Sequence, residues 1–159
     1  MTAPQALATH HSALRDYHIL ETIEAGIQLV GTEIKSIRNR RLSLEDSFAR
    51  VDEAEVFLYN MHVSPYEQAG RFNVESKRLR KLLLRRQQIK RLQGLLTQRG
   101  VTLVPLRLYL KNGFAKIELA VAKGKKVYEK RDTIREREAD RELRRTFKEF
   151  RRRGDRPSV

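Results

Sequence analysis

The stretch VTLVPLRLYLKNGFAKIELAVAKG, from Val101 to Gly124, contains two alternating apolar runs on either side of Asn112-Gly113. Alternation places every second side chain on one face, which is typical of a strand buried on one side. Asn-Gly accepts the positive backbone φ angles of a two-residue hairpin turn. The pattern therefore predicts that Thr102 to Lys111 pairs with Phe114 to Ala122. Pro105 is expected at an edge or a bulge, because proline cannot donate a ladder hydrogen bond.

Shorter patterns of the same kind precede this hairpin. They predict, in chain order, two strands within residues 17–29 that turn at Ala25-Gly26, a short helix within 31–43 and a hairpin of 48–51 with 56–63. A helical region over 75–99, in one or two segments, follows and stops at Gly100. About six strands with one long helical insertion, without regular βαβ alternation, indicate a mainly β protein with helices. The expected fold is a small antiparallel six-stranded barrel, of which the oligonucleotide-binding type is one candidate.

Length and composition set the domain organisation. The chain has 159 residues and 18.7 kDa, enough for one barrel of about 120 residues plus an extension. We expect a flexible lead-in over residues 1–13, a β-barrel domain over 14–126 and a basic tail over 127–159. No apolar run reaches the roughly 18 residues of a membrane span, and the start lacks the order of a signal peptide. These features predict a soluble, cytoplasmic protein without membrane contact.

The net charge of +14 is concentrated in two parts of the chain. Residues 71–99 hold 10 basic and 1 acidic side chains, and residues 123–159 hold 15 and 8, so the remaining residues are slightly acidic. Such basic zones fit a phosphate-rich partner, although an acidic membrane surface attracts the same charges. A membrane site would need an apolar face or lipid motif beside the charge, and none is evident. The distribution favours nucleic acid.

A search for catalytic groups finds no enzyme chemistry. There is no cysteine, which excludes disulfides, thiolate zinc sites and cysteine nucleophiles. His10 and His11 are adjacent in the lead-in, while His18 and His62 lie in strand-like contexts, and no metal-ligand spacing or nucleophile elbow is present. We therefore expect no enzyme, no metal and no cofactor.

Several features indicate RNA instead. Basic side chains surround the apolar stripe of residues 75–99, where they can follow a sugar-phosphate backbone or simply form a solvated helix face. Five aromatic side chains are candidates for stacking on unpaired bases, or for ordinary packing: Tyr66, Phe72, Tyr109, Phe114 and Tyr128.

The tail is charged almost throughout. If residues 132–150 were helical, Asp132, Glu136 and Asp140 would form an acidic i,i+4 file and Arg137, Arg141 and Arg145 a basic one. Repulsion within each file opposes attraction between i,i+3 pairs, so an isolated helix is expected to be marginal. Two interpretations stay open: a plain disordered tail, or a segment that folds on a partner.

Six segments together resemble the SsrA-binding protein (SmpB) family, in order from about Tyr17 to Lys148. They are EAGIQLVGTEIKSIR (Glu24 to Arg38), SFARV (Ser47 to Val51), Ser64-Pro65-Tyr66, RKLLL (Arg80 to Leu84), TLVPLRLYLKNGFAKIELAVAKGKKVYEKR (Thr102 to Arg131) and IRERE (Ile134 to Glu138). The resemblance implies a six-stranded oligonucleotide-binding-type barrel that binds the tRNA-like domain of transfer-messenger RNA and delivers it to stalled ribosomes. It implies an RNA-binding adaptor of trans-translation, not an enzyme, and we expect a monomer.

The resemblance also implies site residues. It implies RNA-binding positions at Glu24, Leu83, Lys116, Lys123 and Lys125. Arg80 and Lys81 join this predicted RNA-binding set on their charge alone, as members of the basic zone of residues 75–99. The tail would occupy the decoding region and the empty mRNA channel, disordered when free and helical on the ribosome, with ribosome contacts from Tyr128, Lys130, Arg131, Arg135 and Arg137. The alternative is a small basic ribosomal or ribosome-assembly protein, which would share the same charge and barrel pattern.

Overall fold

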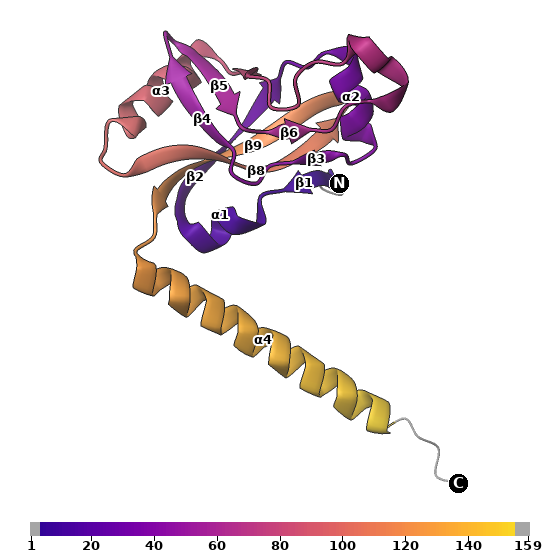
Figure 1. The fold of residues 1–159 in the computed structure, drawn as a ribbon. Helices are drawn as coiled ribbons and strands as arrows, with labels where there is room; N and C mark the ends of the chain where they lie inside the picture. Colours follow the sequence, from indigo (N-terminus) through magenta and orange to yellow (C-terminus); the bar gives the residue numbers. More distant parts are fainter. Residues whose placement is uncertain (1–3, 155–159) are drawn as a thin grey trace. The chain divides into compact units, whose positions relative to one another are not determined.

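Six antiparallel strands close into a barrel in the computed structural model, which describes residues 4–154 apart from the side chains of 127–129, 150 and 152–154 (Figure 1). Around the ring the strands are β8 (Val101–Lys111), β4 (Phe48–Asp52), β5 (Glu55–Tyr59), β7 (Arg80–Leu83), β2 (Tyr17–Ile27) and β9 (Phe114–Gly124), and pairing of β9 with β8 closes it. The expected fold class, a mainly β protein with a small antiparallel six-stranded barrel and helices, is confirmed.

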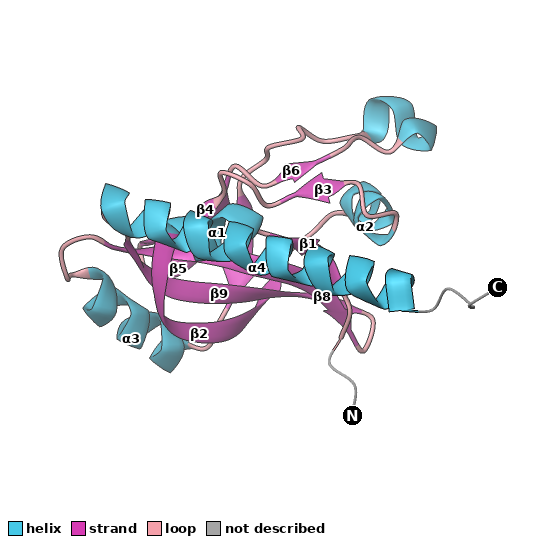
Figure 2. Cartoon of the chain, turned by 90° about the horizontal axis from the view of Figure 1, so that it is seen from below, coloured by secondary structure: helices cyan, strands magenta, loops and turns pink. Residues whose placement is uncertain are grey.

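The remaining elements decorate the barrel or follow it. In chain order they are β1 (Ala6–Thr9), α1 (His11–Asp16), α2 (Gly31–Arg38), β3 (Leu42–Ser43), β6 (His62–Val63), the 3₁₀ turn η1 (Glu67–Phe72), α3 (Arg86–Leu96) and α4 (Val127–Gly154). Helices α2 and α3 lie at opposite ends of the barrel (Figures 1 and 2). α3 contacts β4, β8 and β9 and therefore covers one end of the barrel core.

The predicted β8–β9 hairpin is confirmed. Its register runs from Lys111 opposite Phe114 to Val101 opposite Lys123. Asn112 and Gly113 both have positive φ, 52° and 80°, as a type I′ turn requires. The expected irregularity at Pro105 is also present, because the register shifts between Pro105 and Arg107.

Three other predictions about local structure are wrong. β2 is one continuous strand through Ala25 and Gly26, both buried, and does not turn there. Residues 80–83 form the strand β7 where a helix was expected, because they pair with β5 and β2. The expected loose lead-in contains β1, which pairs with β8, and His10, which is buried with its Nδ1 2.8 Å from the carbonyl oxygen of Pro105.

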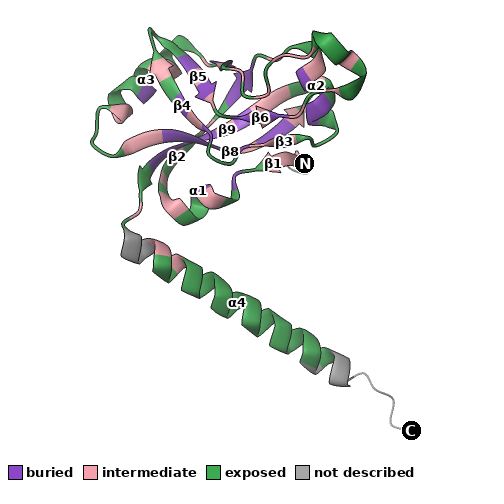
Figure 3. Cartoon of the chain, viewed as in Figure 1, coloured by how far each residue is buried: buried purple, intermediate pink, exposed green. Residues whose placement is uncertain are grey.

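The barrel interior holds the apolar core (Figure 3). Its fully buried side chains come from every barrel strand, and Leu92 of α3 adds to them at one end. A small second cluster around Ala13 and Val104 lies between α1 and β8. Arg80 is an exception to this apolar interior, because its charged side chain is among the largest that are fully buried.

The chain divides into two compact units: the barrel unit, Met1–Gly124, and the C-terminal unit, Lys125–Val159. Helix α4 of the C-terminal unit is exposed along nearly all its described length (Figure 3), including Leu143 and Phe147. None of the described helices is long and apolar enough to cross a membrane. That residues 132–150 are disordered in free protein stays a prediction.

Candidate RNA interface

A row of four residues crosses four neighbouring strands on the outer face of the barrel unit. Tyr109 lies opposite Lys116, Lys116 opposite Gly26, and Gly26 opposite Leu83. Directly opposite residues in antiparallel strands project from the same face of the sheet. The register therefore brings Lys116 and Leu83, distant in the sequence, to either side of Gly26.

Gly26 has no side chain, so the row has a gap at this position. A Cβ atom added there would lie 3.2 Å from Cβ of Leu83, so any other residue would push that side chain aside. Glycine inside a strand commonly marks such a close approach. A hollow of about 600 Å³ opens above it, lined by Glu24, Gly26, Leu83, Leu84, Arg85, Gln88 and Lys116. Leu83 is 52% exposed at its wall.

Glu24 is held in a defined position at this hollow. The hydroxyl of Tyr109 donates a hydrogen bond to Glu24 Oε2, and Nζ of Lys111 lies 3.5 Å from Oε1. The Tyr109 hydrogen bond lowers the pKa of Glu24, partial burial opposes this, and the charges of Lys111 and Lys116 lower it further. Burial and the hydrogen bond to Glu24 raise the pKa of Tyr109 to about 12. Glu24 is thus a fixed, ionised hydrogen-bond acceptor that can take hydroxyl or amino donors.

The neighbouring row supplies a second ion pair. Glu118 lies opposite both Glu24 and Arg107, and Nε of Arg107 donates a hydrogen bond to Glu118 Oε2. The Arg107 guanidinium also lies 5.2 Å from the centre of the Tyr109 ring. Repulsion between the two carboxylates is therefore offset by a cation on each side.

Sequence reasoning missed Arg107 and Lys111 as site residues, and left Tyr109 open between base stacking and ordinary packing. Tyr109 is buried and donates to Glu24, so it supports the site instead of stacking on a base. The signal was available: with Lys111 these residues occupy every second position of β8 and share one face. Phe114, opposite Lys111 and 71% exposed, does remain accessible for stacking.

Lys81 and Leu83 both project outward from β7, since Leu82 between them is buried. The Lys81 ammonium is 2.9 Å from Glu55 Oε1 of β5, and both side chains are partly exposed. An exposed pair of this kind contributes little stability. The Lys81 charge can therefore be shared with a phosphate at low cost.

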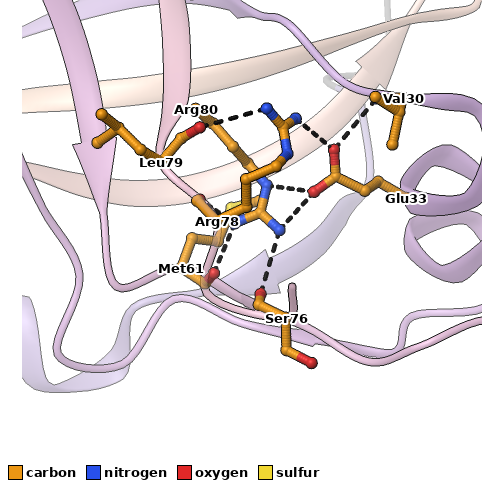
Figure 4. Close-up of polar contacts among 7 residues, drawn as sticks. All are labelled: Val30, Glu33, Met61, Ser76, Arg78, Leu79 and Arg80. Atoms are coloured by element: carbon orange, nitrogen blue, oxygen red, sulfur yellow. Dashed lines mark hydrogen bonds and ion pairs between the residues drawn. The ribbon is translucent and has the colours of Figure 1, made fainter. Parts of the chain in front are cut away.

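Arg80 is not an RNA contact, which corrects the expectation from the sequence. Its side chain is fully buried, and its guanidinium group is directed at Glu33 (Figure 4). Its Nε donates to Glu33 Oε2 at 2.6 Å, and its Nη atoms donate to the carbonyl oxygens of Met61, Ser76 and Arg78. All its donor nitrogens are thus engaged inside the protein, away from any phosphate.

Glu33 is the acceptor for two guanidinium groups. Nη2 of Arg78 donates to its Oε1 at 2.6 Å, as does the backbone N–H of Val30 at 3.1 Å. Burial alone raises the pKa of Glu33, but the hydrogen bonds from Arg78 and Val30 and the charge of Arg80 outweigh it and lower the pKa. Burial likewise lowers the pKa of Arg80 against the opposing effect of Glu33. The cluster joins α2 to β7 and to the loop before it.

The remaining predicted residues lie elsewhere. Lys123, exposed near the end of β9, is seven positions from Lys116 on one strand, about 24 Å along it. Lys125 belongs to the C-terminal unit, where its ammonium donates to Thr133 Oγ1 at 3.1 Å. The described structure therefore gathers Glu24, Leu83 and Lys116, with Lys81 beside them.

The predicted ribosome contacts all fall on α4. Arg131, Arg135 and Arg137 are exposed, and Lys130 is partly exposed; the side chain of Tyr128 is outside the described residues. Among the residues that the structure describes, no group of three or more His, Cys, Asp or Glu side chains is arranged to hold a metal ion.

Comparison with known proteins gives consistent matches over most of the chain. A family model described as SmpB protein matches residues 7–149. An SsrA-binding protein of Geobacillus kaustophilus (strain HTA426) is 58% identical over 145 residues, 91% of this chain and 94% of that protein. Another, of Caldicellulosiruptor bescii (strain ATCC BAA-1888 / DSM 6725 / KCTC 15123 / Z-1320), is 56% identical over 146 residues, 92% of each chain.

A solved structure agrees with these matches. A chain from "tmRNA-SmpB: a journey to the center of the bacterial ribosome" superposes with a TM-score of 0.64 and 46% sequence identity, covering 75% of this chain and 84% of that chain. Fold and sequence thus lead to the same group of proteins.

Proposed function

The chain belongs to the SmpB protein family, and from this premise we propose that it is an RNA-binding adaptor of trans-translation. It binds the tRNA-like domain of transfer-messenger RNA and brings that RNA to stalled ribosomes. Its role is binding and delivery, and we assign it no catalytic step. It acts in association with the ribosome, as a monomer in the cytoplasm.

One observation carries this proposal. Glu24, Leu83 and Lys116, which family resemblance alone suggested as RNA contacts, meet around Gly26 on one outer face of the barrel. The three groups are a fixed carboxylate acceptor, an exposed apolar side chain and a cation. Phosphate contacts from Lys116 and Lys81 would position the RNA, and Glu24 would read a donor group on it.

The tail is proposed to probe the ribosome. Helix α4 places Arg131 and Arg135 one turn apart, i and i+4, and both side chains are exposed. Phosphate groups of ribosomal RNA would neutralise the repulsion within its basic files. We propose that the segment is disordered in free protein, becomes helical on the ribosome, and occupies the decoding region and the empty mRNA channel.

Two protein variants test this division of labour. A chain ending at Lys126 should bind the tRNA-like domain within about threefold of the intact protein and fail to support tagging of stalled peptides. Full-length Lys116→Gln should lose about 10- to 100-fold in affinity, as expected for a lost charge-assisted hydrogen bond. Equal binding to ribosomal RNA fragments would instead identify a ribosomal or assembly protein, and normal tagging by the shortened chain would refute the role of the tail.

A further inference from the structure

A second groove lies on the other side of Leu83. It encloses about 660 Å³ between the β4–β5 turn, β7 and α3. Leu83 and Leu84 line both this groove and the hollow above Gly26, so the two share a wall. We call it the α3 groove; its lining is Glu53, Ala54, Glu55, Lys81, Leu82, Leu83, Leu84, Arg86, Ile89, Lys90 and Gln93.

The α3 groove combines two kinds of surface. Arg86 and Lys90 are exposed cations, four residues apart and therefore on one face of α3. Leu83 and Ile89 supply apolar surface next to them. Pockets for small organic ligands typically enclose about 300–1,000 Å³, so a nucleotide-sized group fits.

We propose that the α3 groove holds one unpaired nucleotide of the bound RNA, with its base against Leu83 and Ile89 and its phosphate on Arg86 and Lys90. The inference rests on the proposed function and extends it, because it assigns the RNA a second contact continuous with the first. Binding the phosphate backbone of duplex RNA would require only the two cations and would leave the apolar surface unused. The apolar wall inside a concave site fits a base turned out of its stack, which apolar side chains can cover.

Like Glu53, Glu55 adds a negative charge to the lining of this groove. Its carboxylate neutralises Lys81 at 2.9 Å and would repel an entering phosphate. RNA must therefore share Lys81 with Glu55. Glu55→Gln should consequently strengthen RNA binding about three- to tenfold, a gain that misfolding cannot produce.

The main test compares two double variants of the full-length protein, using a transcript of the tRNA-like domain of transfer-messenger RNA. Arg86→Gln/Lys90→Gln removes two charges from the groove, while Lys77→Gln/Arg99→Gln removes two exposed charges of the same basic zone that line neither hollow. The groove variant should bind at least tenfold more weakly, with a salt slope reduced by about 1. The control should change by less than threefold; equal losses in both would overturn the proposal.

A second readout addresses the base. In a scan of abasic substitutions through the unpaired segments of the transcript, one position should weaken wild-type binding at least fivefold, and Ile89→Thr should reduce that effect to less than twofold. A scan without such a coupled position would overturn the assignment. If the wild-type protein failed to bind the transcript, both the proposed function and the proposed nucleotide site in the groove would be refuted. Tight wild-type binding that Arg86→Gln/Lys90→Gln leaves unchanged would refute the groove alone.

Discussion

Replacing Glu33 by glutamine should destabilise the barrel unit far more than the same change at the surface. The substitution keeps the size of the side chain and removes its charge. Arg80 is fully buried and Glu33 is 2% exposed, with Arg80 Nη2 2.5 Å from Glu33 Oε2. Without the carboxylate, Arg80 would remain as a buried cation with only carbonyl oxygens as partners.

The magnitude follows from what stays buried. Breaking a buried ion pair by removing one partner typically costs about 3–5 kcal/mol, because the other charge is left uncompensated. Arg80 retains three carbonyl acceptors, and glutamine Oε1 can still accept one hydrogen bond. We therefore expect about 3 kcal/mol, the low end of that range. For a unit of this size the midpoint of thermal unfolding should fall by roughly 10 °C.

Urea unfolding of full-length Glu33→Gln, followed by circular dichroism, measures this change. The matched control is Glu67→Gln, which breaks the pair with Arg41 at 3.5 Å where Glu67 is 84% exposed, and should cost less than about 0.5 kcal/mol. Glu33→Leu/Arg80→Met should cost less than Glu33→Gln, since no charge is left buried. A loss below about 1 kcal/mol for Glu33→Gln would refute the reasoning.

Three further predictions concern pH, RNA and the tail. The pKa of Glu33 is lowered in the folded protein from an ordinary value of 4.5. The ionised carboxylate therefore contributes to stability above pH 4.5, and this contribution is lost as the pH falls through the folded pKa. The free energies of unfolding of wild type and Glu33→Gln should converge at that acid pH, and a constant difference between them would contradict this. Tyr109→Phe removes the donor to Glu24, so transfer-messenger RNA binding in titrations should weaken about three- to tenfold, and an unchanged affinity would show that Glu24 needs no support. Amide exchange over residues 132–150 of free protein should be much faster than in β8 and β9, because ordering costs about 1–2 kcal/mol per residue; equal protection would indicate a preformed helix.

Local signals predicted the β8–β9 hairpin because its strand period and its Asn-Gly turn lie within 24 contiguous residues. The same logic misread Gly26. Glycine permits a turn, but here it permits the approach of Leu83 from another strand. Nothing near Gly26 in the sequence encodes that neighbour, since Leu83 arrives through long-range pairing.

β7 shows a second limit. Its leucines fit a helical stripe when read together with Leu79 and Ile89, and a buried arginine breaks the apolar alternation that would have indicated a strand. Pairing with β5 and β2 on both edges overrides the local preference. Burial of Arg80 depends on its ion pair with Glu33, 47 residues earlier in the sequence. Local sequence therefore suggested a surface contact with RNA, whereas in the fold Arg80 forms a buried ion pair.

The alternation along β7 explains how one strand serves both stability and recognition. Arg80 and Leu82 face inward, where the ion pair and the core hold the strand, while Lys81 and Leu83 face outward between the hollow above Gly26 and the α3 groove. A shift of one residue in register would exchange the two sets, burying Lys81 and exposing Arg80. Because Glu33 can accept the guanidinium only in the observed register, the buried pair also fixes where the proposed RNA contacts of β7 lie.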